Sequence, residues 1–247
     1  MNVQLNNWYS NMKKHALDSL QVNYYYNILL ILIIWIYSKF SKFSFFIIFL
    51  NLIIFINFSY FYHRWTHHIS SYLLTYGHIY HHYNSSNLFS ILLENIWEII
   101  FLFFLLFLKL IVKLEYNIEL WIDELFIIFC ALVWGSIHQI NYSIFHVNTI
   151  HEKQHKNVNT NYGLEIADIF YGTKYDDEVE DFGHFFINII VITILLIFFK
   201  RYFENISPWL FIYFYMSILV ISLLINVILC SKDLNEHLKQ TTEVFFK

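Results

Sequence analysis

The stretch that decides the fold is Phe43–His68, FSFFIIFLNLIIFINFSYFYHRWTHH, in which an apolar run leads directly into a group of histidines. A membrane-spanning helix needs about 20 mostly apolar residues, and Phe43–Phe61 comes close to that length. We expect the helix to continue beyond this run, because His63 and His67 then share one helix face at spacing i, i+4. The stretch therefore predicts a membrane span that ends in a pair of imidazoles.

The chain contains five further apolar runs. Of its 247 residues, 58% are hydrophobic, whereas a soluble domain is about 45–50% apolar. Mean hydropathy is +0.50, and we find no repeat or linker that would divide the chain. These features predict an all-α, multi-span transmembrane bundle that forms a single membrane domain over 1–247. The further runs are roughly Tyr24–Tyr37, Ile96–Val112, Leu120–Ile137, Phe185–Phe199 and Trp209–Cys230.

Charge and cysteine content exclude several other classes. The net charge is −4, and no block of Lys and Arg is present, so we expect no nucleic-acid partner. Cys130 and Cys230 both lie inside apolar runs, where they read as small buried hydrophobes. The polar segment Met1–Val22 lacks the hydrophobic stretch of a signal peptide.

All 13 histidines are expected on one side of the membrane. If all six runs cross, both termini, Tyr62–Leu93 and His138–His184 share that side, and three short connectors occupy the other. Lys and Arg divide 9 to 6 in favour of the histidine side, of 15 in all. By the positive-inside rule, we expect the histidine side to be cytoplasmic.

Two more histidine pairs match the first one. In the second box, HIYHH, His78 can pair with His81 or His82, and in the third, HEKQH, His151 pairs with His155. His138 stands at the end of the fourth run, and His146 follows it. We expect His15, His184 and His237, which lie outside these groups, to be ordinary surface histidines.

The donor set favours two metal ions. Imidazole binds iron, zinc and copper, and a structural zinc site needs four ligands, often with cysteine. About eight histidines without a nearby cysteine fit a pair of ions better. A polar surface without metal remains an alternative. A metal transporter is the other, but its ionisable residues belong inside the spans, whereas these histidines lie beyond the span ends.

The ordered set of motifs resembles the fatty acid hydroxylase / sterol desaturase superfamily of membrane di-iron enzymes. The resemblance covers the histidine-box core, 55–183. In the motif Asp168–Thr173, Tyr171 stands where the family usually has Phe. The segments that carry it are HRWTHH (His63–His68), HIYHH (His78–His82), SSNL (Ser85–Leu88), NYG (Asn161–Gly163), DIFYGT (Asp168–Thr173) and the acidic Asp176–Asp181.

The resemblance implies an oxidoreductase that hydroxylates or desaturates a lipid, such as a sterol or a fatty acyl, sphingoid or ether lipid. It implies two Fe ions, O₂ as oxidant, and an external electron donor that is cytochrome b5- or ferredoxin-like. It also implies the endoplasmic reticulum membrane in a eukaryote. Carried over residue by residue, the metal ligands are His63, His67, His78, His81, His82, His138, His151 and His155.

Gln154 departs from the family pattern, because the third box normally has histidine there. An amide oxygen is a poorer iron ligand, so His146 or a water has to fill the place, or one iron is weakly held. A degenerate non-catalytic relative or a metal-binding membrane protein is therefore the alternative function. Asp168 and Asn161 are interpreted as groups that orient ligands or fix loops, and for Asp168 a helix cap or turn residue is the alternative. We expect Arg64 to pair with an acidic residue such as Glu94 or Glu98, or with a lipid phosphate.

Overall fold

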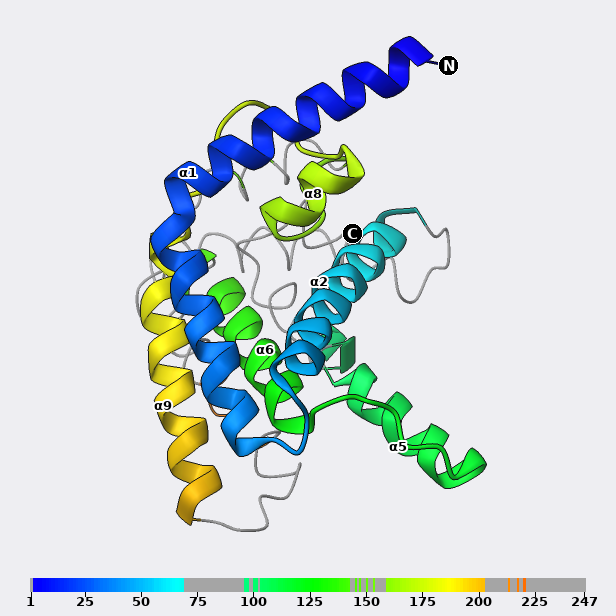
Figure 1. Cartoon of the computed structure of the whole chain (residues 1–247), viewed down its shortest axis with the longest axis vertical. Coiled ribbons are helices and arrows are strands. Elements are labelled where there is room, and N and C mark those ends of the chain that lie inside the picture. The colour runs from blue at the N-terminus through cyan, green and yellow to red at the C-terminus, as the bar shows by residue number, and fades with distance from the viewer. Residues whose placement is uncertain are drawn as a thin grey trace, which may run out of the picture.

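The computed structural model describes residues 2–68, 103–142 and 159–202, and also positions 96, 97, 100, 101, 145, 147, 150, 153, 213, 217 and 220. Every secondary-structure element in these residues is helical, which confirms the predicted all-α class for this part of the chain. The elements are α1 (Asn2–Phe40), α2 (Phe45–His68), α5 (Phe104–Tyr116), α6 (Glu124–Ser136), the π-helix η1 (Ile137–Tyr142), α8 (Glu165–Tyr171), the 3₁₀ helix η2 (Phe182–Phe185) and α9 (Phe186–Tyr202) (Figure 1).

Four helical stretches in the described residues are long and apolar enough to cross a membrane. They correspond to the first, second, fourth and fifth predicted runs. The third run falls partly on α5, whose 13 residues extend only about 20 Å at 1.5 Å per residue, and the sixth lies outside the described residues apart from three positions. The four stretches are Trp8–Phe40, Phe45–His67, Glu124–Tyr142 and Phe182–Tyr202.

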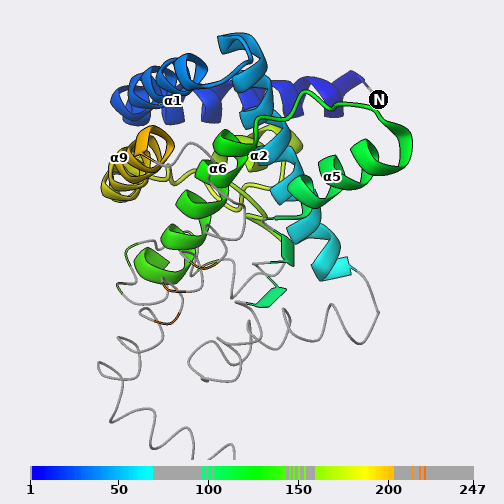
Figure 2. The same ribbon diagram turned by 90° about the horizontal axis from the view of Figure 1, so that it is seen from below.

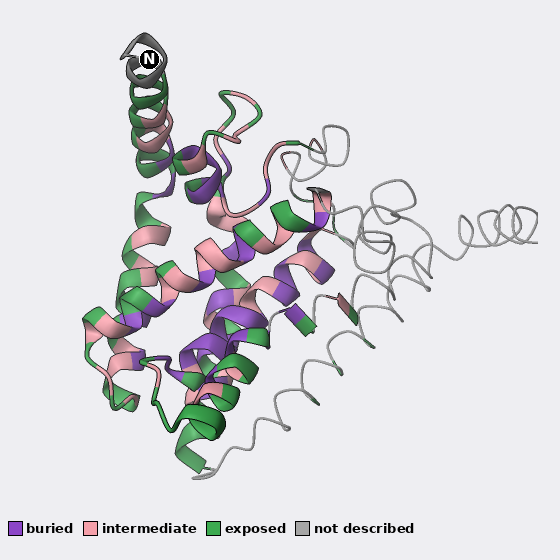
Figure 3. Cartoon of the chain, turned by 90° about the vertical axis from the view of Figure 1, so that its right-hand side faces the viewer, coloured by how far each residue is buried: buried purple, intermediate pink, exposed green. Residues whose placement is uncertain are grey.

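Helix α6 forms the centre of the bundle. In the span Glu124–Tyr142, which joins α6 and η1, 67% of the residues in the most apolar part are buried, against 28% in Phe45–His67 and in Phe182–Tyr202. Helix α6 packs against α2, α5 and α9, which surround it when the molecule is viewed from below (Figure 2). Phe126, Ala131 and Leu132 are completely enclosed, and the buried residues concentrate along this helix (Figure 3). A helix that is apolar on every side is expected in such a central position.

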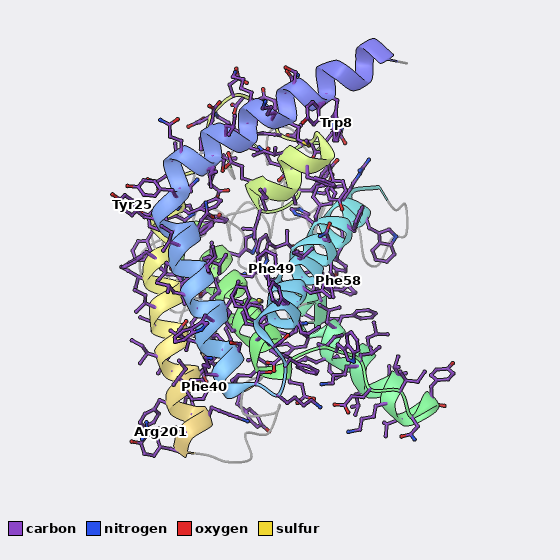
Figure 4. All side chains as sticks on the ribbon, in the orientation of Figure 1. Trp8, Tyr25, Phe40, Phe49, Phe58 and Arg201 are labelled. Carbon is purple, nitrogen blue, oxygen red and sulfur yellow. The ribbon has the colours of Figure 1, made fainter. Side chains whose placement is uncertain are left out.

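The outer helices present apolar side chains outward. On α9, Ile187, Val191, Ile194 and Phe198 are all exposed, and their spacing places them on one face. Side chains project outward along the length of this helix (Figure 4). Such a stripe would be unfavourable in water, so it fits a helix whose outer face contacts lipid.

The first two predicted short connectors, Ser38–Lys42 and Lys113–Glu119, meet at one end of the bundle. Lys42 in the first forms an ion pair with Glu119 in the second. The hydroxyl of Ser41 donates to the carboxylate of Asp123, which also accepts from the backbone N–H of Phe126 at 2.8 Å and so caps α6. These contacts agree with the prediction that the connectors share one side.

Helix α1 bends at Asn23, where φ is −104° and ψ is 15°. The Asn23 side chain is fully buried. Its amide donates to the carbonyl of Glu180 at 2.7 Å and accepts from the backbone N–H of Phe182 at 2.8 Å. Beyond the bend, the N-terminal half of α1 lies across α8 (Figure 1). The polar segment that precedes the first span is thus a helix that covers the histidine end of the bundle.

Candidate metal centre

The first histidine box forms the last turns of α2. The rings of His63 and His67 have their centroids 5.0 Å apart, with the planes at 36°. Both side chains are half-buried, so they lie against protein and not in bulk water. The predicted i, i+4 pair is therefore present, and two imidazoles placed in this way can contribute to one metal site.

A backbone carbonyl fixes the orientation of the His63 ring. Its Nδ1 lies 2.7 Å from the carbonyl oxygen of Tyr162. A carbonyl oxygen only accepts hydrogen bonds, so Nδ1 carries the proton in this contact. In the neutral ring Nε2 then holds the lone pair. Metal-binding histidines usually donate their other ring N–H in this way to a carbonyl or carboxylate.

Asp168 holds the turn that supplies this carbonyl. Its carboxylate accepts from the backbone N–H of Tyr162 at 2.8 Å, from that of Gly163 at 3.0 Å and from the hydroxyl of Thr173 at 2.7 Å. The residue is only 2% exposed. Of the two interpretations of Asp168, the structure therefore supports loop fixing, and it does so directly behind the carbonyl that orients His63.

The backbone of this turn has a left-handed conformation at two positions. Asn161 has φ +53°, and its N–H donates to the carbonyl of Thr173 at 3.0 Å. Gly172 closes α8 with φ +70°, where L side chains are strained. Asparagine tolerates such angles better than most residues. The NYG and DIFYGT motifs thus form one unit, in which each motif holds the other.

The same unit is docked on α2 through Tyr60. Its hydroxyl lies 3.1 Å from the hydroxyl of Thr173, and its ring stacks on Tyr171 with centroids 4.4 Å apart. A Cβ atom at Gly163 would lie 3.4 Å from the Tyr60 side chain, an ordinary van der Waals contact, so the turn lies directly against Tyr60. Arg64 is exposed, with its guanidinium 3.5 Å from the Tyr60 hydroxyl. Its expected acidic partners, Glu94 and Glu98, lie outside the described residues.

Burial is the main influence on the Asp168 carboxyl, and it raises the pKa to about 6. The hydrogen bonds from Thr173, Gly163 and Tyr162 act in the opposite direction and favour the ionised form. At neutral pH the group is therefore a carboxylate that accepts from three donors. This is the charge state that the turn requires.

His138 lies on the π-helix η1 that extends α6. Its ring is half-buried and perpendicular to that of Tyr142, with centroids 6.2 Å apart. Short π-helical stretches occur frequently at functional sites. Neighbouring Asn141 donates to the carbonyl of His184 at 2.5 Å. The distorted turn that carries His138 is therefore tied to the start of α9.

Of the third box, the structure describes Lys153. Its ammonium group bonds to Asp176 at 2.7 Å and also to Glu178. The hydrogen bonds that Lys153 donates to these two carboxylates raise the pKa of its ammonium group, so this side chain remains charged at neutral pH. The contacts place the middle of the third box against the acidic segment that follows α8.

The remaining predicted ligands lie outside the described residues. In the described part of the chain, no three His, Cys, Asp or Glu side chains form a group that could hold a metal ion. His63 and His67 are brought together, and His138 does not complete a three-residue group with them. The ligands outside are His78, His81, His82, His151 and His155, together with Gln154 and the alternative ligand His146.

Two histidines expected at the surface are in fact mostly covered. The side chain of His184 is only 14% exposed, and its Nδ1 lies 2.6 Å from the carbonyl of Asp181. The side chain of His15 is 16% exposed, with Nε2 3.5 Å from Asp177. The expectation was wrong because both rings pack against the acidic segment, which the sequence alone does not place near them.

Sequence reasoning missed the partners of His63 and of the third box. The carbonyl of Tyr162 gives no signal, because every residue has one. Tyr60 gives a weak signal, since a tyrosine three residues before a histidine box could belong to the apolar span. Comparisons of the chain with protein-family models, with curated proteins and with solved structures find no match. The functional argument therefore rests on this chain's own residues.

Proposed function

We propose that the chain is a di-iron membrane oxidoreductase of the fatty acid hydroxylase / sterol desaturase type, which uses O₂ to hydroxylate or desaturate a lipid. The hydrogen bond from His63 Nδ1 to the carbonyl of Tyr162 carries the proposal. It sets the tautomer that a metal ligand needs, and it joins the first histidine box to the NYG motif. An ordinary polar surface has no need of a buried aspartate that holds such a carbonyl in place.

The donor set fits a pair of iron ions. Neutral imidazoles are good ligands for iron, and the eight histidines lie at or beyond the ends of apolar runs. When bound, the ions supply the activation of O₂ and the removal of hydrogen from a carbon atom. The residues that would hold them are His63, His67, His78, His81, His82, His138, His151 and His155.

The protein's own residues orient the ligands and admit the substrate. Asp168 and Tyr162 hold the His63 ring at a fixed angle. Because the first box continues directly from the apolar part of α2, a lipid chain beside that helix reaches the box without leaving the apolar layer. A lipid in the surrounding bilayer is therefore the substrate class that fits best. Electrons come from a separate donor protein of the cytochrome b5 or ferredoxin type.

Gln154 supports a second candidate function, a metal-binding relative that does not oxidise a substrate. An amide oxygen binds iron less well than an imidazole, so a site that uses Gln154 holds one ion weakly. This candidate predicts metal binding without O₂ consumption. The two functions therefore differ in one measurable property.

The test is the iron and zinc content of the detergent-purified full chain. The variants are His81→Ala, which removes a ligand of the second box, and Gln154→His, which restores the family residue. His237→Ala removes a histidine outside the boxes and is the matched control. We expect about two irons per chain in the wild type and in the control, and a clear loss in His81→Ala.

A second arm measures O₂ consumption by the reduced protein with sterol, acyl and ether lipids. Lipid-dependent consumption that disappears in His81→Ala supports the oxidoreductase. Iron that is gained only in Gln154→His would contradict it and would favour the relative without chemistry. Iron retained equally in all variants would show that the boxes do not bind it.

A further inference from the structure

The acidic segment Asp176–Asp181 follows α8 and would ordinarily be interpreted as a solvated charged loop. In the structure its side chains and backbone contact residues from four other parts of the chain. Its five acidic residues differ in exposure: Asp177 is 74% exposed, whereas Glu180 is only 5% exposed. The segment has a buried side, and that side contacts the elements that carry the predicted ligands.

The first of these elements is the third histidine box. Lys153 bonds to Asp176 at 2.7 Å and to Glu178, and the Lys153 and Asp176 side chains are only 32% and 33% exposed. Asp176 also accepts from the backbone N–H of Glu178 at 3.0 Å. One lysine is thus held between two carboxylates whose own positions are linked.

The second element is the π-helix of His138. The hydroxyl of Tyr142 donates to the carboxylate of Glu180 at 3.1 Å, and His184 Nε2 lies 3.8 Å from the same carboxylate. Tyr142 is four residues after His138 on η1. A π-helical turn is a rare local conformation, and this bond connects its last residue, Tyr142, to the acidic segment.

The acidic segment is itself held by hydrogen bonds to α8 and α1. The backbone N–H of Glu180 donates to the buried carboxylate of Glu165 at 3.0 Å, and this carboxylate also accepts from Lys174 at 2.6 Å. The amide of Asn23 accepts from and donates to the backbone of the same region. Glu165 begins α8, the helix that also carries Asp168. The anchor of Lys153 and Tyr142 is therefore connected to the unit that orients His63.

We propose that Lys153 and Tyr142 are positioning residues, which fasten the third histidine box and the π-helix of His138 to the acidic segment and thereby set the spacing between the predicted metal ligands. The inference rests on the proposed function, since it concerns the same ligands. In this proposal the acidic segment Asp176–Asp181 binds side chains of the same chain. Carboxylates already engaged by Lys153 and Tyr142 are also poorly placed to bind a basic partner.

The experiment measures cobalt(II) binding to the full chain in detergent. Cobalt(II) binds the ligands that iron(II) does, and its visible absorption reports coordination geometry. The variants are Lys153→Met, which keeps the length of the side chain, and Tyr142→Phe, which removes one oxygen. The matched control is Lys14→Met, because Lys14 pairs with Asp177 of the same segment at 3.0 Å but with side chains 56% and 74% exposed. Lys153→Arg tests rescue by a conserved charge.

We expect Lys153→Met and Tyr142→Phe to weaken cobalt binding by roughly ten-fold and to change the absorption spectrum. Lys14→Met should match the wild type, and Lys153→Arg should recover most of the affinity. A purely structural role would lower the unfolding temperature and leave the spectrum of the folded protein unchanged, which would overturn the inference. Should Lys153→Met fail to fold, Tyr142→Phe decides by the same criteria. If the wild type binds no cobalt, the proposed function itself fails, and this inference fails with it.

Discussion

The polar residues at the two ends of the helical bundle make different kinds of contact. At the connector end, Asn51 bonds to the carbonyl of Trp121 at 2.9 Å and to the N–H of Asp123 at 2.7 Å. Lys109 donates to the carbonyl of Ile122 at 2.7 Å. These contacts satisfy the backbone groups that the start of α6 and the preceding connector leave open. The polar contacts described there therefore close the ends of helices.

The histidine end contains more polar structure than its helix ends require. Asp168, Glu165 and Glu180 are three buried carboxylates, against Asp123 at the connector end, and burial of charge is unfavourable unless it is paired. A left-handed asparagine occurs at both ends, Asn161 here and Asn117 in the second connector, but the π-helix η1 is found at the histidine end. Short π-helical stretches are frequent at functional sites. The difference between the ends indicates that the histidine end is built to hold side chains in position, whereas the connector end is built to close helices.

The largest expected effect comes from Asp168→Asn. The amide keeps the size of the carboxylate but directs its own N–H groups at donors, so at least one of three hydrogen bonds is lost. We expect the free energy of unfolding at pH 7.5 to fall by about 3 kcal/mol, with a loss of metal from the protein that remains folded. Denaturation in detergent and metal analysis measure the two effects. Asp177→Asn, at a residue that is 74% exposed, should change neither, and wild-type behaviour of Asp168→Asn would remove the distinction between the ends.

Asn51→Leu tests the connector end by the same measurements. Leucine has a similar volume but leaves the carbonyl of Trp121 and the N–H of Asp123 unpaired in a buried site. We expect the free energy of unfolding to fall by about 2 kcal/mol, with an unchanged metal content per folded chain. Loss of metal together with stability would show that the two ends are not independent.

Much of the fold could be predicted from the sequence, because apolar runs determine where helices can cross a membrane. Phe43–Phe61 and the box at His63 predicted a single helix, and α2 is that helix. The break in α1 could not be predicted in this way. Asn23 is an ordinary polar residue in the sequence, and its side chain pairs at the bend with Glu180 and Phe182, which are distant in the sequence.

The candidate site could be predicted at the level of residue types but not of partners. Spacing alone places His63 and His67 on one face. By contrast, the contact with Tyr162 joins a side chain to a backbone atom 99 residues away, and no pattern of side chains encodes it. The role of the acidic segment has the same cause. Lys153 and Asp176 have ordinary surface residue types, and only the tertiary fold brings them together.

Thr173→Val tests one hydroxyl group at the histidine end. The substitution is nearly isosteric and removes the hydroxyl that bonds to Asp168 at 2.7 Å and to Tyr60 at 3.1 Å. We expect a loss of about 1 kcal/mol in stability and metal binding that is weaker by several-fold. Tyr60→Phe loses the contact with Thr173 and the longer one with exposed Arg64, but it leaves the bond between Thr173 and Asp168 and the stacking on Tyr171 in place, so its effects should be smaller. Equal effects from the two variants would mean that Asp168 does not mediate the influence on metal.

Lys42→Met should have the smallest effect of all. Lys42 and Glu119 join the two connectors, but their side chains are 61% and 53% exposed, and exposed ion pairs contribute little to stability. We expect no measurable change in the unfolding temperature or in metal content. A clear drop in the unfolding temperature would show that the connectors depend on this pair and not on the buried contacts of Asn51 and Asp123.

The most direct test of the account is the Mössbauer spectrum of the full chain purified from cells grown with ⁵⁷Fe, recorded beside that of His63→Ala. The account predicts about two irons per chain, with the spectrum of a coupled pair, and a site that is disrupted when His63 is removed. Iron in isolated single sites, zinc in place of iron, or a coupled pair that is indifferent to His63 would contradict it.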